Sequence, residues 1–222
     1  FSTPAPANRM WYFQGGTPPT STSPSPAVTY ASPGNYDVKL VVSNAAGQDS
    51  LTKSSFVTVT TAPIADVVLV LVSSTVCKND SVFASATITN GGLAPSIDWI
   101  VNGTVVASNN LAFASVFTDG DVLKVRMTSS DNCVAVKTAA DSVTMTVNNL
   151  PAVTLSSQGY LCELDGPMQL SGGMPAGGIY SGLGISNDTI YPSLSGVGSH
   201  WVYYTYTEPT TGCANEKKRA IS

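Results

Sequence analysis

The side chains that support acid–base chemistry are few in this chain of 222 residues. His200 is the only histidine, and a general base needs a reaction partner and a group that orients it. It alternates with Val202, Tyr204 and Tyr206 along an apolar stretch, so we expect it to fill a packed position in a strand. The chain has no His-rich zinc pattern, no G-x-S-x-G elbow and no P-loop. These observations predict a protein that is not an enzyme and that requires no cofactor.

Two aspartates come closest to a cation site. Asp119 and Asp121 flank Gly120, but calcium prefers six or more oxygen ligands, and no third carboxylate lies nearby in the sequence. A turn is therefore favoured over a calcium site. The glycine-rich run 172–184 has neither the spacing of a phosphate-binding loop nor a following helix, so we expect tight turns and close backbone approach there. The sequence predicts no bound metal.

Four cysteines indicate the cellular compartment: Cys77, Cys133, Cys162 and Cys213. They form no C-x-x-C pair, which argues against a zinc knuckle. Three ways of pairing them into two disulfides are possible in principle, and disulfides indicate an oxidising, extracytoplasmic setting. The alternative is a set of buried free thiols. We expect disulfides and a location outside the cell or on its surface.

The composition excludes several classes of partner. Charged residues make up 11% of the chain, with a formal net charge of −4, whereas a quarter is usual. Nucleic-acid binding requires a basic face, and the only basic cluster is 217–219. The hydrophobic fraction of 43% is sufficient for folded cores, and no apolar run reaches the length of a membrane span. We expect no nucleic-acid partner and no direct insertion into a membrane.

Hydrophobic periodicity predicts β-structure along the chain. Residues 36–42 are apolar at every second position, which is the period of a half-buried strand. Turn-forming residues flank them at 32–35 and 44–47. Asn102-Gly103 between two apolar segments indicates a two-residue hairpin. The predicted fold class is all-β, with tandem immunoglobulin-like β-sandwiches. In the middle of the chain we expect strands at 65–72, 81–89, 96–101, 104–107, 111–117, 121–128 and 142–148.

Residues 9–61 carry the motif of a known family. An aromatic W-x-F, a glycine pair and the run P-G-x-Y-x-V-x-L-x-V-x-N-x-x-G together resemble the PKD domain, a seven-stranded immunoglobulin-like sandwich of extracellular proteins. The family has two further strands before the tryptophan. The resemblance therefore implies that the chain begins inside a domain, through truncation or, alternatively, for completion by a strand of another chain. The matching residues are Trp11, Phe13, Gly15, Gly16, Tyr30, Pro33, Gly34, Tyr36, Val38, Leu40, Val42, Asn44 and Gly47.

The rest of the chain resembles immunoglobulin-like repeats of large Bacteroidetes surface proteins. This resemblance implies a cargo of type IX secretion, a gliding or adhesion protein, or an enzyme with an appended array. In the last unit the matches include Cys162, Leu170, Gly172, Gly173, Pro175, Ala176, Gly177, Gly178, Tyr180, Gly182, Gly184, Gly196, Gly198, Tyr204, Tyr206, Gly212 and Cys213. In the middle unit the match is less dense and includes Cys77, Gly91, Gly92, Trp99, Asn102, Gly103, Gly120, Asp121 and Cys133.

Short proline-containing segments mark the expected domain boundaries. Residues 61–63 and 149–151 are predicted linkers. They divide the chain into a PKD-like domain at 1–61 and immunoglobulin-like domains at 62–150 and 151–222. Linkers this short are not flexible coils, so we expect a semi-rigid array.

The domain boundaries suggest how the cysteines pair. We expect the disulfides Cys77–Cys133 and Cys162–Cys213, because each pair then lies inside one predicted sandwich. By analogy with the immunoglobulin core, Trp99 is expected to pack against the first of these disulfides.

Two aromatic residues are the best candidates for contact with a ligand. If Tyr204 and Tyr206 face the core, then Trp201 and Tyr203 face outward on the same strand. Exposed aromatic rings stack on sugars or fill a partner's pocket. The alternative is a contact with a neighbouring domain or a cross-strand aromatic ladder.

A short repeated motif predicts modification. The motif D-(S/T)-apolar resembles the O-glycosylation sequon of exported Bacteroidetes proteins, and glycans would add polarity to a surface poor in charge. N-x-(S/T) sequons also occur, although these matter only in a host that glycosylates asparagine. The candidate O-linked sites are Ser50, Ser81, Ser142 and Thr189, and the asparagines are Asn79, Asn102 and Asn187.

These features together predict a structural spacer or stalk segment of a large secreted or cell-surface adhesin or gliding-motility protein. Its expected partners are the neighbouring domains of the same chain and, beyond them, surface glycans or other proteins. The alternative is an array of carbohydrate-binding or accessory modules attached to a secreted hydrolase.

Overall fold

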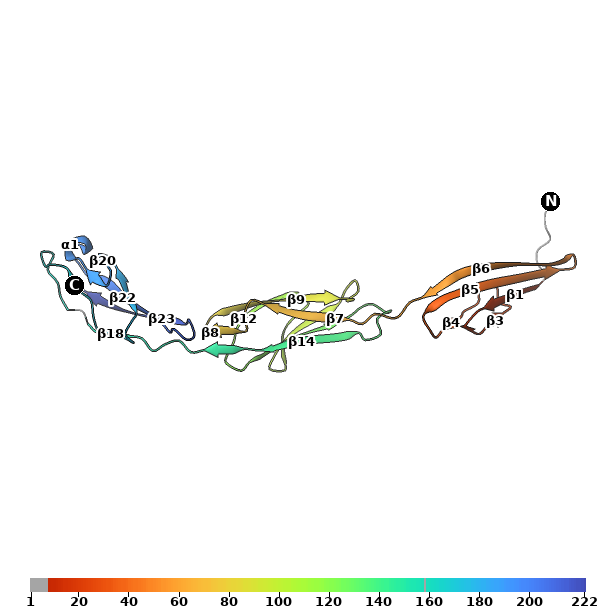
Figure 1. Cartoon of the computed structure of the whole chain (residues 1–222), viewed down its shortest axis with the longest axis horizontal. Coiled ribbons are helices and arrows are strands. Elements are labelled where there is room, and N and C mark those ends of the chain that lie inside the picture. Colours follow the sequence, from red (N-terminus) through yellow and green to blue (C-terminus); the bar gives the residue numbers. More distant parts are fainter. Residues whose placement is uncertain (1–7, 158) are drawn as a thin grey trace. The chain divides into compact units, whose positions relative to one another are not determined.

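The computed structural model describes residues 8–157 and 159–222, and its contacts divide the chain into two compact units. The first unit comprises residues 1–64 with 133–135, and the second comprises 65–132 with 136–222. Strands dominate both units, and the described residues contain one short helix, α1 (Pro192–Ser195) (Figure 1). The fold class is all-β, as predicted.

The first unit is built around two long antiparallel strands. In its main sheet, of order β3-β1-β5-β6, the alternating residues of β5 place Leu40 between Trp11 and Leu51. Phe13 and Val38 are buried, whereas the side chain of Leu51 is 62% exposed. The apolar face of this sheet is therefore only partly covered by the described residues. The strands are β1 (Asn8–Phe13), β2 (Gly16–Thr17), β3 (Thr20–Ser21), β4 (Thr29–Tyr30), β5 (Gly34–Asn44) and β6 (Gly47–Val59).

The second unit contains two groups of sheets, and none of the described sheets combines strands from both groups. We call β7–β15 the middle module and β16–β23 the C-terminal module. The middle module has the sheets β11-β10-β13-β14, β12-β9-β7 and β15-β8. Its strands are β7 (Asp66–Leu71), β8 (Thr75–Cys77), β9 (Ser81–Thr89), β10 (Ser96–Val101), β11 (Thr104–Ser108), β12 (Ala112–Val116), β13 (Val122–Thr128), β14 (Thr138–Thr144) and β15 (Thr146–Asn148).

Trp99 is the centre of the middle module's core. Its side chain is completely buried, its ring stacks on Phe113 with centroids 5.4 Å apart, and its indole N–H donates to the carbonyl of Asn110 at 2.8 Å. The core position of Trp99 was predicted, but the expected disulfide partner is replaced by the ring of Phe113. Facing residues of β13, including Leu123 and Val125, complete the core.

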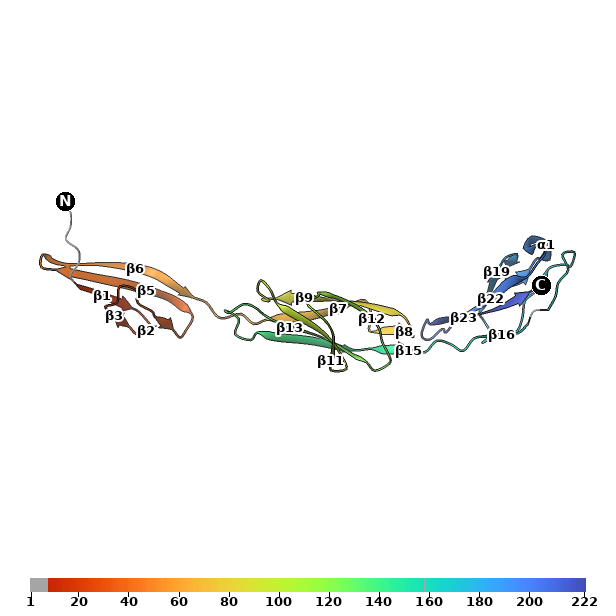
Figure 2. The same cartoon turned by 180° about the vertical axis from the view of Figure 1, so that it is seen from behind.

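One predicted strand of this module is wrong in its extent. The expected strand at 142–148 is divided into β14 and β15 at Met145, whose side chain is 1% exposed. The backbone N–H of Met145 donates to Asp121, and its carbonyl accepts from Gly120. These bonds hold Met145 against the turn that precedes β13, and after Met145 the strand β15 pairs in parallel with β8 (Figure 2).

The C-terminal module has shorter strands and a compact apolar core. Three sheets, β16-β18, β17-β21-β20 and β19-β22-β23, enclose Leu155, Leu170, Ile190, Val202 and Tyr204. The strands are β16 (Thr154–Leu155), β17 (Met168–Gln169), β18 (Gly173–Met174), β19 (Ile179–Gly182), β20 (Ile185–Ser186), β21 (Thr189–Ile190), β22 (His200–Thr207) and β23 (Ala214–Ile221). None of the described helical residues forms a segment with the length and hydropathy required to cross a bilayer.

Candidate functional site

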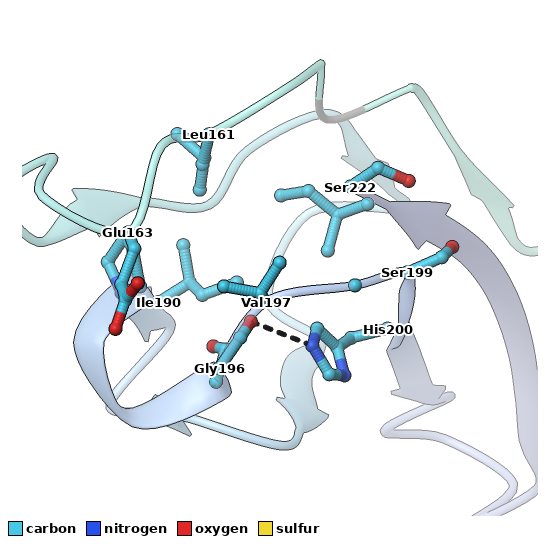
Figure 3. A pocket seen from close by; sticks show the side chains of 12 residues that line it. Leu161, Glu163, Ile190, Gly196, Val197, Ser199, His200 and Ser222 are labelled. Carbon is cyan, nitrogen blue, oxygen red and sulfur yellow. Dashed lines mark hydrogen bonds between the residues drawn. The ribbon is translucent and has the colours of Figure 1, made fainter.

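His200 lies at the start of β22, on the face that carries Val202 and Tyr204 into the core. Its ring is half-buried, and its Nε2 is 3.0 Å from the carbonyl oxygen of Gly196 (Figure 3). A carbonyl oxygen only accepts hydrogen bonds, so this contact requires that Nε2 carries the proton. That nitrogen is therefore committed to holding the segment after α1 and is not available as a base.

The ring of His200 also borders a cavity of about 360 Å³. Apolar side chains that line the cavity include Leu161, Ile190 and Ile221, and Glu163 adds a carboxylate to the lining (Figure 3). The arrangement offers a hydrophobic recess with few polar groups. Among the described residues, no group of three or more histidine, cysteine or acidic side chains is gathered as a metal site would require.

Trp201 and Tyr203 lie on the outer face of the sheet β19-β22-β23. Trp201 is 50% exposed, and Tyr203 is half-buried between Ser181 and Lys218 on the flanking strands. The ammonium group of Lys218 lies 4.7 Å from the centroid of the Trp201 ring, which is a cation–π contact. A sugar that stacks on this ring face must displace Lys218, so the contact competes with ligand binding.

Asp119 and Asp121 are both used to hold the turn before β13. The carboxylate of Asp121 accepts from the backbone N–H of Thr118 and from the side-chain amide of Asn102, each at 2.7 Å. Asp119 accepts from the N–H of Val147 at 2.9 Å. The Thr118 N–H and the Asn102 amide hold the pKa of Asp121 below its usual value of 3.8, because they stabilise the charged form. These contacts support the turn that the sequence predicts.

An ion pair between neighbouring strands was not predicted from the sequence. Asp98 of β10 lies directly opposite Arg126 of β13, and the two side chains are 2.7 Å apart. The hydroxyl of Ser108 donates to the same carboxylate at 2.8 Å. Arg126 and then Ser108 lower the pKa of Asp98. The available signal was the opposite charge at equivalent positions of two predicted strands.

The disulfide in the described chain joins Cys77 to Cys213, across a sequence separation of 136 residues. The predicted pairings Cys77–Cys133 and Cys162–Cys213 are therefore wrong. Cys213 is completely buried and Cys77 is half-buried, whereas Cys133 and Cys162 are exposed and lie outside this bond.

The division into units and the strand order explain why the predicted pairs do not form. Cys77 is opposite Asn148 at the end of β15 and belongs to the second unit, whereas Cys133 belongs to the first unit. In the C-terminal module, Cys162 follows Leu161, whose N–H donates to Ser222.

Ser222 follows β23 and Cys213 precedes it, so the length of this strand, roughly 25 Å, separates Cys213 from the end of the module that contains Cys162. A disulfide requires Cα atoms within about 7 Å. Cys162 and Cys213 are thus at opposite ends of the C-terminal module.

The four D-(S/T)-apolar motifs differ in the accessibility of the hydroxyl. Ser50, Ser81 and Ser142 are exposed on β6, β9 and β14. Thr189 is half-buried, and its hydroxyl contacts the side chain of Gln169 and the carbonyl of Asn187.

The aspartates of these motifs have structural roles. Asp49 and Asp141 each accept the backbone N–H of the following serine, and Asp188 accepts the N–H of Tyr180 at 2.8 Å. Asp80 accepts the N–H of Cys77 at 3.2 Å. The motif therefore has an explanation in the fold, and its role as a sequon stays a prediction.

The asparagines of the N-x-(S/T) sequons share a backbone conformation. Asn79, Asn102 and Asn187 have φ values of 74°, 50° and 49°. Asparagine is one of the few side chains that tolerates this left-handed region. Turn geometry accounts for the residue type at all three positions.

Comparison with known protein families gives a match in the N-terminal part of the chain. Residues 2–59 match the PKD domain family, in agreement with the resemblance of its motif. Among curated proteins, none is significantly similar to this chain.

Several solved structures are similar at low identity. The fibronectin(III)-like modules of Clostridium thermocellum CbhA are 19% identical, with a TM-score of 0.32, over 67% of this chain and 82% of that one. A Ca²⁺-stabilised adhesin with which an Antarctic bacterium binds ice is 18% identical, with a TM-score of 0.41, over 98% and 66% of the two chains. Three domains of the outer capsid protein Hoc of bacteriophage RB49 are 12% identical, with a TM-score of 0.43, over 100% and 90%. At TM-scores below 0.5 these similarities are too distant to carry a functional argument.

Proposed function

We propose that the chain is an extracellular spacer segment of a secreted or cell-surface protein. The observation that carries this proposal is the Cys77–Cys213 disulfide, which connects the middle and C-terminal modules covalently in addition to the chain itself. Such a bond restrains two successive modules. It also favours an oxidising compartment.

Other side chains of the second unit are committed to structure in the same way. His200, Asp98, Asp121 and Asp188 each hold a turn or a pair of strands through hydrogen bonds. PKD and immunoglobulin-like domains are typically non-catalytic, so we assign no enzymatic role to the chain. Within the proposal, the parent protein is an adhesin or a gliding-motility protein exported by type IX secretion, as the repeat motifs imply.

Small-angle X-ray scattering on the oxidised 222-residue chain tests the spacer function. A spacer must hold its ends apart, so we expect an elongated particle whose largest dimension is stable between low and high salt. A compact particle, or one whose dimension varies as in a flexible string of beads, contradicts the proposal.

The alternative is a carbohydrate-binding accessory module of a secreted hydrolase, and the half-exposed Trp201 beside Tyr203 favours it. A glycan array separates the two functions. Binding that is lost in the Trp201→Ser/Tyr203→Ser variant, with unchanged thermal unfolding, supports the alternative. Absence of binding across the array supports the spacer.

We also propose that Ser50, Ser81 and Ser142 carry O-linked glycans in the native host, since their hydroxyls are exposed. Thr189 is the weakest candidate, because its hydroxyl is engaged. The intact mass of the native protein tests this: an unmodified mass contradicts the proposal, and added hexose units lost in the three Ser→Ala variants support it.

A further inference from the structure

The Cys77–Cys213 disulfide joins two parts of the chain that lie in different groups of sheets. Cys77 is the last residue of β8 in the middle module, and Cys213 immediately precedes β23 in the C-terminal module. Residues 149–153 connect the same two modules along the chain. The disulfide is therefore a second covalent connection between them.

This second connection changes the covalent path that carries a pull along the chain. A force that enters before β7 and leaves after β23 reaches Cys77 through β7 and β8, crosses the sulfur–sulfur bond, and continues from Cys213 through β23. Residues 78–212 form a closed loop beside this path. We propose that the disulfide is a mechanical bypass, which prevents residues 78–212 from being extended when the chain is under load.

The bypassed loop contains the cores of both modules. The fully buried side chains Trp99, Leu123 and Met127 of the middle module lie within 78–212, and so do Val202 and Tyr204 of the C-terminal module. Without the disulfide, tension passes through every one of these residues. With it, tension acts on β7, β8 and β23, and the strands that hold most of the core are spared.

The surroundings of the bond suit this role. Cys213 has no exposed surface, and its carbonyl accepts the N–H of Glu208 at 2.9 Å. Beside Cys77, the N–H of Lys78 donates to Asn148 at 2.9 Å. Thiol–disulfide exchange requires that a thiolate reaches a sulfur, so burial of Cys213 protects the bond on that side.

The inference deepens the proposed spacer function, on which it rests for the presence of tension. Its test is independent of that function. Scattering measures whether the folded chain is elongated, whereas the bypass is measured by the length of the unfolded chain under force.

Single-molecule pulling of the full chain between handles at its two ends tests the bypass. Complete unfolding of the oxidised protein should give a final length shorter than that of the Cys77→Ser/Cys213→Ser variant in reductant by roughly 450–490 Å, which is the extension of a chain segment with the sequence separation of 136 from Cys77 to Cys213. This comparison does not require that the variant folds, because both chains are measured after unfolding. Equal final lengths overturn the proposal.

A Cys162→Ser variant is the matched control. It should keep the short final length of the oxidised wild type, since Cys162 is not part of the bond. If the chain lengthens instead, Cys162 is cross-linked in solution and the proposal fails. Two closed loops of roughly 180 Å each, the result expected for Cys77–Cys133 and Cys162–Cys213, also overturn it.

Peptide mapping supplies a second readout. Non-reducing digestion with trypsin and a glutamyl endopeptidase cleaves after Lys78, Glu163 and Glu216, so the peptides containing Cys77, Cys162 and Cys213 are separate. A linked pair of the Cys77 and Cys213 peptides supports the bypass. A Cys213 peptide linked to Cys162 contradicts it.

Discussion

The ring of Tyr204 occupies the space in which a side chain at Gly178 would stand. The phenol oxygen of Tyr204 accepts the backbone N–H of Gly178 at 2.8 Å, and a Cβ added at Gly178 would lie 2.5 Å from the ring. Gly173 meets the same ring at 2.6 Å. The phenol of Tyr204 also donates to the carbonyl of Pro175. The backbone of the glycine-rich run 172–184 thus packs closely around the buried ring of Tyr204.

We therefore predict that Gly178→Ala destabilises the C-terminal module by about 1–3 kcal/mol, the usual cost of inserting a methyl group into a packed site. The fluorescence of the unfolding protein in urea measures this change. Gly166→Ala is the control, because a Cβ at Gly166 meets no atom within 4 Å. A Gly178→Ala protein as stable as the control would contradict the packing described.

Trp99 should carry a large share of the middle module's stability. Trp99→Ala removes a completely buried ring and its contact with Phe113, so we expect a loss of about 3–5 kcal/mol in the free energy of unfolding. Trp99→Phe keeps a ring but leaves the carbonyl of Asn110 without the indole donor, and should cost less than the alanine variant. Chemical denaturation measures both. The half-exposed Trp201, changed to alanine, is the surface control and should cost far less.

The lowered pKa values of two aspartates predict how the stability of the protein changes in acid. The folded-state pKa values of Asp98 and Asp121 are lowered from 3.8, so their contribution to stability is complete above the unfolded pKa. It is lost as the pH falls through the folded values. Urea midpoints measured from pH 7 downward should begin to fall near pH 4, and less steeply in the Asp98→Asn/Asp121→Asn variant.

The cause of one of these shifts is directly testable. Arg126 is the largest cause of the lowered pKa of Asp98, and it plays no part in that of Asp121. In Arg126→Gln, NMR titration should show the pKa of Asp98 rising toward its ordinary value while that of Asp121 stays unchanged. A joint shift of both would mean that the whole module is perturbed.

The stability of the middle module should depend on how well the residue at position 102 tolerates a left-handed backbone conformation. Asn102 has φ of 50°, its amide N–H donates to Asp121, and its side-chain oxygen accepts from Val122 at 2.9 Å. Asn102→Gly keeps the backbone freedom and loses the bonds, whereas Asn102→Ala loses both. We expect the alanine variant to be less stable than the glycine variant by about 1 kcal/mol in urea denaturation. The reverse order would contradict a turn-forming role.

Local features of the fold were predictable where short-range chemistry decides them. The hairpin at Asn102-Gly103 connects β10 to β11 as expected, and both residues have positive φ. The alternation at 36–42 lies within β5, and the match of residues 2–59 to the PKD domain agrees with the motif. These features depend on the residues next to one another in the chain.

The candidate site was predictable only in part. The alternation of β22 correctly placed Tyr204 inside and Trp201 outside, because neighbouring side chains of a strand point to opposite faces. It gave no sign that Lys218 of β23 covers the Trp201 ring, since that depends on the register of two strands.

What the sequence by itself determined is the β-structure, the turns and the burial of Trp99 and Tyr204, because these follow from alternation and residue type. The partner of each cysteine was decided by tertiary structure. Whether two sulfurs meet depends on which ends of which strands they occupy: β23 places Cys213 a full strand length from Cys162, and Cys133 belongs to a different unit from Cys77. The spacing of the cysteines in the sequence does not determine how far apart they lie in the fold.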